Sequence, residues 1–338
     1  MNAIRGLLVL AGFALVPAGC DREAAGPAPA PGSGGPQNRP IALRVGHFPN
    51  VTHAQALVAH ARSRMGEGWF ERRLGAGVAI EWSIYNAGPS AMEAVFANSI
   101  DLTYVGPSPA LNAYVKSRGE EIRIIAGAAV GGAALVVRKD GPIRAPADFR
   151  GKKVATPQLG NTQDVACRAW LIAHGFKVTQ LSGDVSVVPT SNPDQLNLFR
   201  SGSIDAVWTV EPWVSRLEVE AGGRIFLEES ETVTTVLVAS ARFLGRHREL
   251  ARKFAEAHAE LTEWIRANPA EAQRLVEAEL KEETTRPLPQ EILSRSWNRL
   301  KFTSEIRIEP LETFVIAAKT VGFLRDEVDL SRLVEVPR

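Results

Sequence analysis

Hydrogen-bonding side chains gather at Asn161, Thr162 and Gln163, within residues 154–170. This stretch predicts a short strand, a loop with Pro and Gly, and a helix whose N-cap is Asn161 or Thr162. Such a junction presents unpaired backbone N–H groups beside the Thr hydroxyl and two carboxamides. Because the positive end of the helix dipole lies at the same place, we expect a site for an anion or a carboxamide. A helix start with no further role is the alternative for any single junction, so the hypothesis depends on there being four.

Strand and helix patterns alternate from residue 41 onward. The expected strands are 42–47, 78–85, 102–105, 153–156, 185–189, 206–209 and 224–226. The expected helices are 53–64, one that opens at 86–90 and ends at 96, 110–117, 161–174, 192–201 and 211–221. This order predicts mostly parallel sheets, in which ligands bind at the carboxyl ends of the strands.

The alternation changes twice along the chain. Residues 122–130 and 133–137 follow each other without a helix, and we interpret them as an antiparallel pair whose second strand leads into another domain. Residues 232–239 alternate in hydrophobicity and are expected to return to the first unit. The tail is mostly helical, at 246–267, 269–279, 289–299 and 309–321. We therefore expect two lobes, 41–138 plus 240–338 and 139–239, with a cleft and a hinge between them.

The N-terminus carries features of export. An apolar run at 6–16 follows Arg5 and predicts a secretory signal peptide over 1–19, too short to be a permanent transmembrane helix. Ala18 and Gly19 before Cys20 resemble a bacterial lipobox, although Pro17 stands where Leu is usual. The resemblance makes Cys20 the lipidation site, and plain secretion with an unmodified cysteine is the alternative.

Residues 20–40 are rich in Pro, Gly and Ala and lack apolar periodicity. Such a segment cannot bury enough surface to order itself. We interpret it as a flexible tether with a reach of about 25 Å, which would keep a globular body near a membrane.

Composition bounds the remaining possibilities. The 338 residues suit two domains, and 45% hydrophobic with 23% charged residues is typical of a soluble globular protein. Without the signal peptide, 38 of the 39 basic residues stand against 38 acidic ones, and no basic run occurs. This balance argues against nucleic-acid binding and electrostatic membrane binding. With Cys20 lipidated, Cys167 has no disulfide partner, and its helical spacing from Trp170 and Leu171 predicts a buried thiol rather than a nucleophile.

Four stretches resemble the solute-binding subunits of bacterial ABC importers for nitrate, sulfonates and taurine, a group that includes thiamine-pyrimidine binders. They are LRVGHFPNVTHAQAL, DLTYVGPSPALNAYV, ADFRGKKVATPQLGNTQDVACRAWL and SIDAVWTVEPW. The resemblance runs from about residue 41 to about 239. It implies an α/β fold, the two-lobed type II periplasmic-binding-protein clamp, each lobe a mostly parallel sheet flanked by helices. It also implies a monomer without cofactor or catalytic activity, held by its lipid in the periplasm or on the outer face of the cytoplasmic membrane. There it would pass a small ligand to a permease and an ATPase.

Position by position, the resemblance places the ligand among four loops. The residues implied are His47, Asn50, Thr52 and His53; Gly106, Pro107 and Ser108; Gly160, Asn161, Thr162 and Gln163; and Trp208, Glu211 and Trp213. Alternatives stay open for several of them. Ser108 could only cap its helix, Glu211 before Pro212 could only start one, and the Trp side chains could belong to the core.

The ligand class depends on the charges near these loops. His47 and His53 could donate hydrogen bonds to an anion, but no third ligand lies near them in the sequence, so a metal site is poorly supported. The loops contain no Lys or Arg, and Arg138 and Arg168 lie just outside them. A small sulfonate-, taurine- or nitrate-like solute held by N–H and hydroxyl groups fits, as does a neutral heterocycle beside Trp. A larger apolar ligand also remains open.

Two other function classes compete with the importer subunit. The fungal thiamine-pyrimidine synthase has the same fold class and consumes its own histidine, but an enzyme of that kind would need a cofactor lysine and a cysteine-rich motif. Here one cysteine remains in the body of the chain and an export signal precedes it. A lipid-tethered sensor that signals to a membrane receptor would have the same fold as a transport protein. We therefore expect a binding protein rather than an enzyme, with transport and sensing both open.

Overall fold

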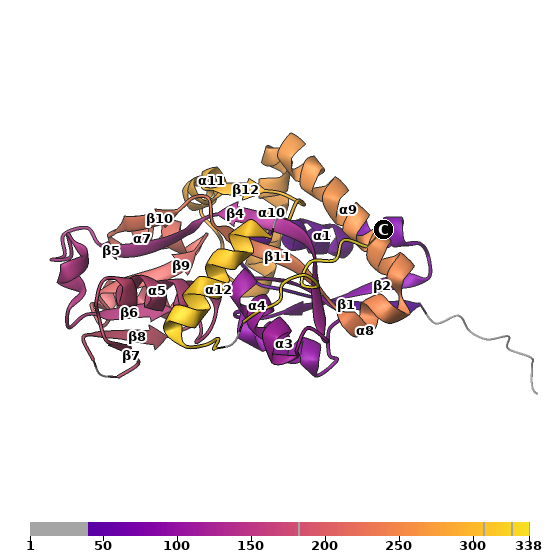
Figure 1. Ribbon diagram of the computed structural model, residues 1–338. Helices are drawn as coiled ribbons and strands as arrows, with labels where there is room; N and C mark the ends of the chain where they lie inside the picture. Colours follow the sequence, from indigo (N-terminus) through magenta and orange to yellow (C-terminus); the bar gives the residue numbers. More distant parts are fainter. Residues whose placement is uncertain (1–39, 182, 307, 326, 338) are drawn as a thin grey trace, which may run out of the picture. The chain divides into compact units, whose positions relative to one another are not determined.

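Two six-stranded sheets organise the part of the chain that the structure describes (Figure 1). The computed structural model describes residues 40–181, 183–306, 308–325 and 327–337. The predicted signal peptide over 1–19, the lipidation site Cys20 and all of the tether except Pro40 lie outside the described residues.

The first sheet combines strands from the early, middle and late parts of the chain. Its order is β12-β4-β11-β3-β1-β2. The strands are β1 (Ile41–His47), β2 (Val78–Ile84), β3 (Leu102–Val105), β4 (Ile122–Gly131), β11 (Val233–Ser240) and β12 (Leu300–Phe302). β1 pairs in parallel with β2 and β3, whereas β11 is antiparallel to β3 and β4. The sheet therefore has a parallel half, β3-β1-β2, and an antiparallel half that ends at β12.

The second sheet repeats this plan with the residues between β4 and β11. Its order is β10-β5-β9-β6-β8-β7. The strands are β5 (Ala133–Arg138), β6 (Lys153–Thr156), β7 (Val178–Thr179), β8 (Val185–Pro189), β9 (Ala206–Val210) and β10 (Gly223–Glu229). β6 is parallel to β8 and β9, and β5 is antiparallel to β9 and β10. The α/β prediction is confirmed, and both sheets are mixed because the strands that carry the chain between them run antiparallel to their neighbours.

Helices cover both faces of each sheet. Those that follow strands of the first sheet are α1 (Ala54–Arg64), α2 (Trp69–Leu74), α3 (Gly88–Phe96), α4 (Pro107–Lys116) and α8 to α12 (Ala241–Arg246, Arg248–Ala267, Pro269–Thr284, Gln290–Asn298, Glu309–Val321). Those of the second are α5 (Thr162–Ala173), α6 (Asn192–Ser201) and α7 (Trp213–Ala221), and two 3-10 turns are η1 (Val51–His53) and η2 (Pro146–Phe149). Alternate residues of β11 show the two faces: Leu237 packs with α1, α9 and α10, whereas Val236 and Val238 pack with α3, α4 and α12.

The chain crosses between the sheets at Gly131 and Gly132. β4 pairs with β11 and β12, and β5 pairs with β9 and β10, so the expected antiparallel pairing of residues 122–130 with 133–137 is wrong. Both glycines have positive φ, +81° and +73°, and a Cβ at Gly131 would lie 2.5 Å from the carbonyl oxygen of Arg299. Only glycine fits such a crossing, which replaces the hairpin that consecutive strands usually form. The return at β11 follows the prediction.

The last helices contact elements of both sheets. α11 packs against α7, and α12 packs against α4 and α5. The tail that the sequence assigns to the first lobe therefore also reaches helices of the second sheet. None of the helices within the described ranges is both long and apolar enough to cross a bilayer.

Cys167 is buried in the apolar core between the second sheet and α5, as predicted. Burial raises the pKa of its thiol well above the usual value, with the nearby Asp164 carboxylate adding to the effect. The thiol is therefore protonated and unreactive at neutral pH.

Candidate functional site

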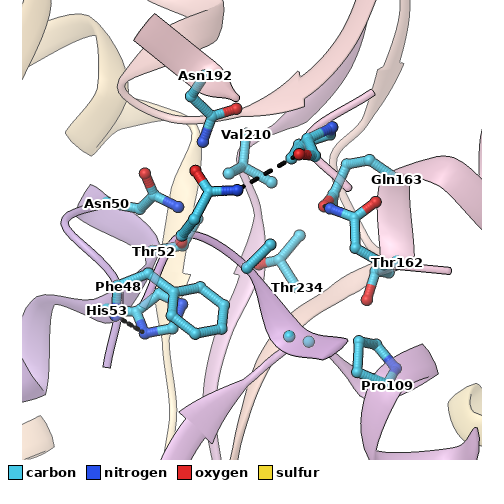
Figure 2. A pocket seen from close by; sticks show the side chains of 16 residues that line it. Phe48, Asn50, Thr52, His53, Pro109, Thr162, Gln163, Asn192, Val210 and Thr234 are labelled. Atoms are coloured by element: carbon cyan, nitrogen blue, oxygen red, sulfur yellow. Dashed lines mark hydrogen bonds between the residues drawn. The ribbon is translucent and has the colours of Figure 1, made fainter. Parts of the chain in front are cut away.

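A cleft lies where the helix N-termini of the two sheets face each other (Figure 2). It comprises about 370 Å³ of space, including the part open to solvent. Its walls follow the carboxyl ends of β1, β2 and β3 on one side and of β6, β8 and β9 on the other, where α/β sheets bind ligands. The lining residues are Phe48, Asn50, Thr52, His53, Asn86, Ala87, Gly88, Gly106, Pro109, Pro157, Asn161, Thr162, Gln163, Asn192, Val210 and Thr234.

Residues expected in three of the four loops meet in this cleft. The structure brings together Asn50, Thr52, His53, Gly106, Asn161, Thr162 and Gln163. The first four come from the first sheet and the other three from the start of α5. A single strand-to-helix junction is weak evidence for a ligand site, but the convergence of these loops in one cleft strengthens that prediction.

The two sides touch at several points. Thr162 Oγ1 accepts a hydrogen bond from the backbone N–H of Ser108 at 3.4 Å. A Cβ added to Gly106 would lie 2.2 Å from the same Oγ1, so this close approach requires glycine. Trp213 Nε1 donates to Asn50 Oδ1 at 3.0 Å. Because the first contact is long, it is weak and can be exchanged for a ligand at low cost.

The carboxamides of the cleft use their oxygens within the protein. Asn50 Oδ1 accepts from Trp213, and Asn192 Oδ1 accepts from Thr209 Oγ1 at 3.0 Å. Gln163 Oε1 accepts from Asn161 Nδ2 at 3.1 Å. In the described part of the chain, the NH₂ groups of Asn50, Asn192 and Gln163 have no such partner and remain available in the cleft (Figure 2). Asn86 differs, because its NH₂ group donates to the Pro157 carbonyl oxygen at 3.4 Å. The cleft thus presents three free amide NH₂ groups.

Asp164 holds the loop that presents Thr162 and Gln163. Its buried carboxylate accepts from Thr156 Oγ1 at 2.8 Å, from the Gly160 N–H at 2.9 Å and from Arg168 Nε at 2.9 Å. Asn161 Oδ1 caps α5 by accepting from the Asp164 N–H, which confirms Asn161 as the N-cap. Arg168 also donates to the Val187 carbonyl, so its charge serves the scaffold and not the cleft.

His53 is a neutral donor in the cleft wall. The Phe48 N–H donates to its Nδ1 at 3.3 Å, which places the ring proton on Nε2. Burial, and to a smaller extent the nearby His47, lowers the pKa of His53 well below the usual value. The ring therefore stays uncharged at neutral pH.

The cleft attracts anions through dipoles rather than through ions. None of its lining residues is Lys, Arg, Asp or Glu. The N-terminal ends of α3, α4, α5 and α6 all supply lining residues, and each end carries a partial positive charge and unpaired N–H groups. Such a site suits a group with one negative charge spread over several oxygens.

Sequence reasoning missed several lining residues. Asn86, Ala87 and Gly88 open α3 after β2, and Asn192 opens α6 after β8, so the same strand-to-helix signal could have identified them. Phe48, Pro109, Val210 and Thr234 carry no comparable signal, because ordinary core positions have the same residue types.

The other predicted site residues lie elsewhere. Ser108 and Gly160 border a separate small cavity beside Phe323, and the buried Ser108 hydroxyl has no partner among the described residues and does not cap α4. Pro107, the first residue of α4, is buried and is not among the lining residues. His47 is buried beside His60 and Glu283 and is not among the residues that line the cleft.

Trp208 and Glu211 belong to the interior of the second sheet. Trp208 packs in its core and donates from Nε1 to Glu229 Oε2 at 2.9 Å. The fully buried Glu211 carboxylate accepts from Ser215, Ser296 and Arg299. Burial raises the pKa of Glu211, and the Arg299 guanidinium opposes that rise. Neither side chain is directed into the cleft.

An outer chamber, the vestibule, continues the cleft. The two share Asn50, Asn86 and Asn192, and Trp213, with apolar neighbours such as Leu196 and Leu288, lines the vestibule. It comprises about 1640 Å³, including open solvent.

Arginines add positive charge to the vestibule. Arg200 and Arg216 share Glu220 as an ion-pair partner. Arg286 has no ion-pair partner within the described ranges. Because Glu220 and Glu283 also line it, the vestibule combines apolar walls with charges of both signs, whereas the inner cleft is polar and uncharged.

Sequence comparisons relate the chain to binding proteins. A model of the NMT1-like family matches residues 37–280. A protein of Escherichia coli provisionally named an aliphatic sulfonates-binding protein is 25% identical over 203 residues, 59% of this chain and 58% of that protein. A Bacillus subtilis protein of the same name is 23% identical over 232 residues, 68% and 63% of the two chains. The chain spans about three fifths of the length of these named relatives.

Structural comparisons give the same fold. The alkanesulfonate-binding protein of Xanthomonas axonopodis bound to MOPS has a TM-score of 0.69 at 18% identity, covering 88% of this chain and 99% of that one. The periplasmic nitrate-binding protein of Synechocystis has a TM-score of 0.69 at 14% identity, covering 84% and 82%. The predicted type II periplasmic-binding-protein fold is thereby confirmed. Because the family model matches more than half of the sequence, the chain belongs to the NMT1-like family.

Proposed function

We propose that the protein is the substrate-binding subunit of an ABC importer for a small anionic solute of the sulfonate or nitrate class. The observation that carries the proposal is the set of three amide donors in the cleft: the NH₂ groups of Asn50, Asn192 and Gln163 are free while their oxygens are occupied. An oxyanion offers only acceptors and therefore complements such a cleft. The names of relatives that bind sulfonates or nitrate are consistent with this ligand class.

The vestibule favours an organic sulfonate over nitrate. Nitrate would occupy the inner cleft alone and would leave the apolar vestibule walls unused. An alkane- or aminoalkanesulfonate would place its anionic head among the amide donors and its organic tail against Trp213 and Leu288. Burial of the tail would add roughly 0.8 kcal/mol per methylene group.

The ligand contacts in this proposal come from both sheets. Asn50, Thr52, His53 and Gly106 act from one side, with Asn86, and Asn161, Thr162 and Gln163 act from the other, with Asn192. We assign residues 41–138 plus 240–338 to one lobe and 139–239 to the other. The lobes would close on the ligand by movement about Gly131 and Gly132, and the closed monomer would dock on the permease and its ATPase.

We also propose that a lipid on Cys20 anchors the protein, with residues 20–40 as a tether, so that it works in the periplasm or on the outer face of the cytoplasmic membrane. Mass spectrometry of the mature N-terminus tests this directly. A diacylated Cys20 would support the anchor, and an unmodified N-terminus beginning elsewhere would remove it. The Cys20→Ala variant should no longer sediment with membranes.

Thermal-shift measurements test the ligand class. The protein would be screened against alkanesulfonates, taurine, nitrate, bicarbonate and thiamine-pyrimidine precursors. A ligand at a hundred times its Kd should stabilise the fold by about 2.7 kcal/mol. We expect alkanesulfonates to give the largest shift. A shift with the pyrimidine compounds alone, or with none of the panel, would contradict the proposal.

A further inference from the structure

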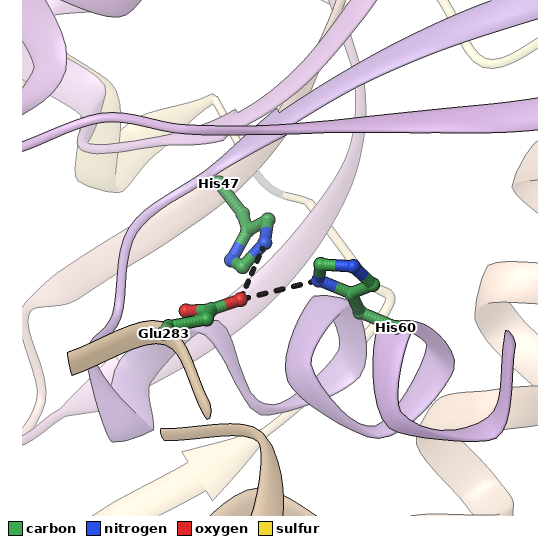
Figure 3. Close-up of side chains that lie close together, drawn as sticks. All are labelled: His47, His60 and Glu283. Carbon is green, nitrogen blue, oxygen red and sulfur yellow. Dashed lines mark hydrogen bonds and ion pairs between the residues drawn. The ribbon is translucent and has the colours of Figure 1, made fainter. Parts of the chain in front are cut away.

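A second polar cluster lies within the first sheet and its helices and reaches the vestibule wall through Glu283 (Figure 3). His47 ends β1, His60 lies on α1, and Glu283 lies near the end of α10. His47 Nε2 is 3.0 Å and His60 Nδ1 is 3.2 Å from the same oxygen, Glu283 Oε1. Donor atoms of the three residues all lie within 4.8 Å of one another. Three parts of the chain that are distant in sequence thus direct their donors toward one point.

Two of the donor atoms are buried without a hydrogen-bond partner among the described residues. The side chains of His47 and Glu283 are fully buried, and that of His60 is 12% exposed. His47 Nε2 is close to Glu283 Oε1 but makes no hydrogen bond with suitable geometry, and Glu283 Oε2 also lacks a partner among the described residues. Buried polar atoms are almost always paired, so two unpaired atoms in one cluster require an explanation.

The other ring nitrogen of His47 indicates which lone pair is free. Nδ1 lies 3.4 Å from the carbonyl oxygen of Phe48, to which a neutral ring would donate its proton. Nε2 then carries a lone pair beside a carboxylate oxygen, an arrangement that repels unless a cation lies between them. A ligating histidine commonly donates its second N–H to a backbone carbonyl in this way.

We propose that His47 Nε2, His60 Nδ1 and the Glu283 carboxylate bind a divalent transition-metal ion, with Zn²⁺ as the ion that fits best. Two imidazole nitrogens and a carboxylate are a common ligand set for Zn²⁺, whereas Mg²⁺ and Ca²⁺ prefer oxygen ligands alone. Binding through both Glu283 oxygens would give four donor atoms and would account for the unpaired Oε2.

Neighbouring residues give this site an outer layer. Glu279 Oε1 lies 2.8 Å from His60 Nδ1, and Arg64 Nε donates to both Glu279 oxygens at 3.0 and 3.1 Å. Glu279 is therefore already balanced by Arg64, which would hold it beside the site, because a metal-bound Nδ1 has no proton to donate to it. The Trp82 ring stacks on His60 and meets His47 edge-on, which excludes water from two sides. Because His47 precedes Phe48 of the cleft wall, the metal would also fix the loop that carries His53.

The test uses untagged protein that has been stripped with a chelator. Calorimetry with Zn²⁺ should give one equivalent of binding, Mg²⁺ should give none, and Co²⁺ should produce the visible absorption of a low-coordinate site. Glu283→Gln and His47→Gln should each weaken Zn²⁺ binding at least about a hundredfold, since loss of an outer partner alone costs 10–100-fold. His174→Gln, at an exposed histidine after α5, is the matched control and should leave binding unchanged.

Either of two results would contradict the proposed metal site. The wild-type protein would take up no Zn²⁺ or Co²⁺, or the Glu283→Gln variant would bind both ions as tightly as wild type. The cluster would then be an ion-pair network of histidine and glutamate side chains. If a variant fails to fold in the metal-free state, the Co²⁺ spectrum of the wild-type protein still decides the question, and an absent spectrum contradicts the proposal.

Discussion

Two strand-to-helix junctions of the second sheet differ in how their polar groups are used. Asn161 to Gln163 follow β6, and Glu211 with Pro212 follows the neighbouring parallel strand β9. In the first junction, the Gln163 NH₂ group and the Thr162 hydroxyl proton are unclaimed within the described chain. In the second, Glu211 accepts from Ser215, Ser296 and Arg299. The first, the open junction, has free donors for a ligand. The second, the completed junction, has its carboxylate fully hydrogen-bonded within the protein.

The residue types alone do not separate these two junctions. A carboxylate beside two Trp residues has the chemistry of a binding site as much as an amide beside a hydroxyl does. The difference arises because Arg299 and Ser296, which lie far along the chain, occupy Glu211. Unsatisfied hydrogen-bonding capacity, rather than residue type, distinguishes a binding junction from a structural one.

The largest expected effect is on stability, at the completed junction. Arg299→Leu would leave the Glu211 carboxylate buried without its cation, and we expect a loss of about 3–5 kcal/mol in the free energy of unfolding. Urea denaturation measures it, with Arg295→Leu on the exposed face of α11 as the control that should change little. Ligand affinity, measured where the variant remains folded, should stay near that of wild type. Lost affinity with unchanged stability would reverse the roles of the two junctions.

The next effect is on binding, at the open junction. The double variant Thr162→Ala, Gln163→Ala removes two donors to a charged ligand, each worth about 1.5–3 kcal/mol, so sulfonate affinity should fall about a hundredfold or more. The melting temperature without ligand should be nearly unchanged, because neither side chain supports the fold as Asp164 does. Calorimetry and a thermal scan of the same sample measure both. Equal losses would mean that this junction is structural too.

A smaller effect is expected where the two sides meet. Gly106→Ala would place a Cβ 2.2 Å from Thr162 Oγ1 and hinder closure, which we expect to weaken sulfonate binding about tenfold. Combining it with Thr162→Ala should cost less than the sum of the two single variants, since the clash is then removed. A double-mutant cycle by calorimetry measures the difference. Simple additivity would show that Gly106 and Thr162 do not meet in the bound state.

The smallest effect concerns pH. Burial lowers the pKa of His53 well below its usual value, so the ring gains no proton as pH falls through the range in which an exposed histidine titrates. Sulfonate affinity should be constant over this range, and it should rise only when pH approaches the lowered pKa, because protonation adds a positive charge beside the anion. Affinity that already rises below about pH 7 would indicate a charged His53 and a site that depends on an ion.

The fold was predictable because its signals are local. The strand at 102–105, the helices at 192–201 and 309–321 and the Asn161 cap depend on residues close in sequence, and the structure places them as expected. The true partners of residues 122–130 and 133–137 could not be predicted. Two strands that are adjacent in the sequence give no sign that Gly131 and Gly132 direct them into different sheets.

Half of the site followed from the same local signals. Asn50, Thr52, His53, Gly106, Asn161, Thr162 and Gln163 all lie at junctions and line the cleft. The cluster of His47, His60 and Glu283 could not be seen, since its members meet only through packing of α1 and α10 against β1. A local pattern can indicate which groups are available, but tertiary contacts decide which of them remain free.

The central claim is that the cleft binds an anion through neutral donors alone. Calorimetry with methanesulfonate and with methanesulfonamide, its nearly isosteric neutral analogue, tests this most directly, because the amide places donors against the donors of the cleft. The account predicts measurable sulfonate binding and sulfonamide binding at least about a hundredfold weaker, about 2.7 kcal/mol. Equal binding of the two compounds, or tighter binding of the sulfonamide, would contradict it.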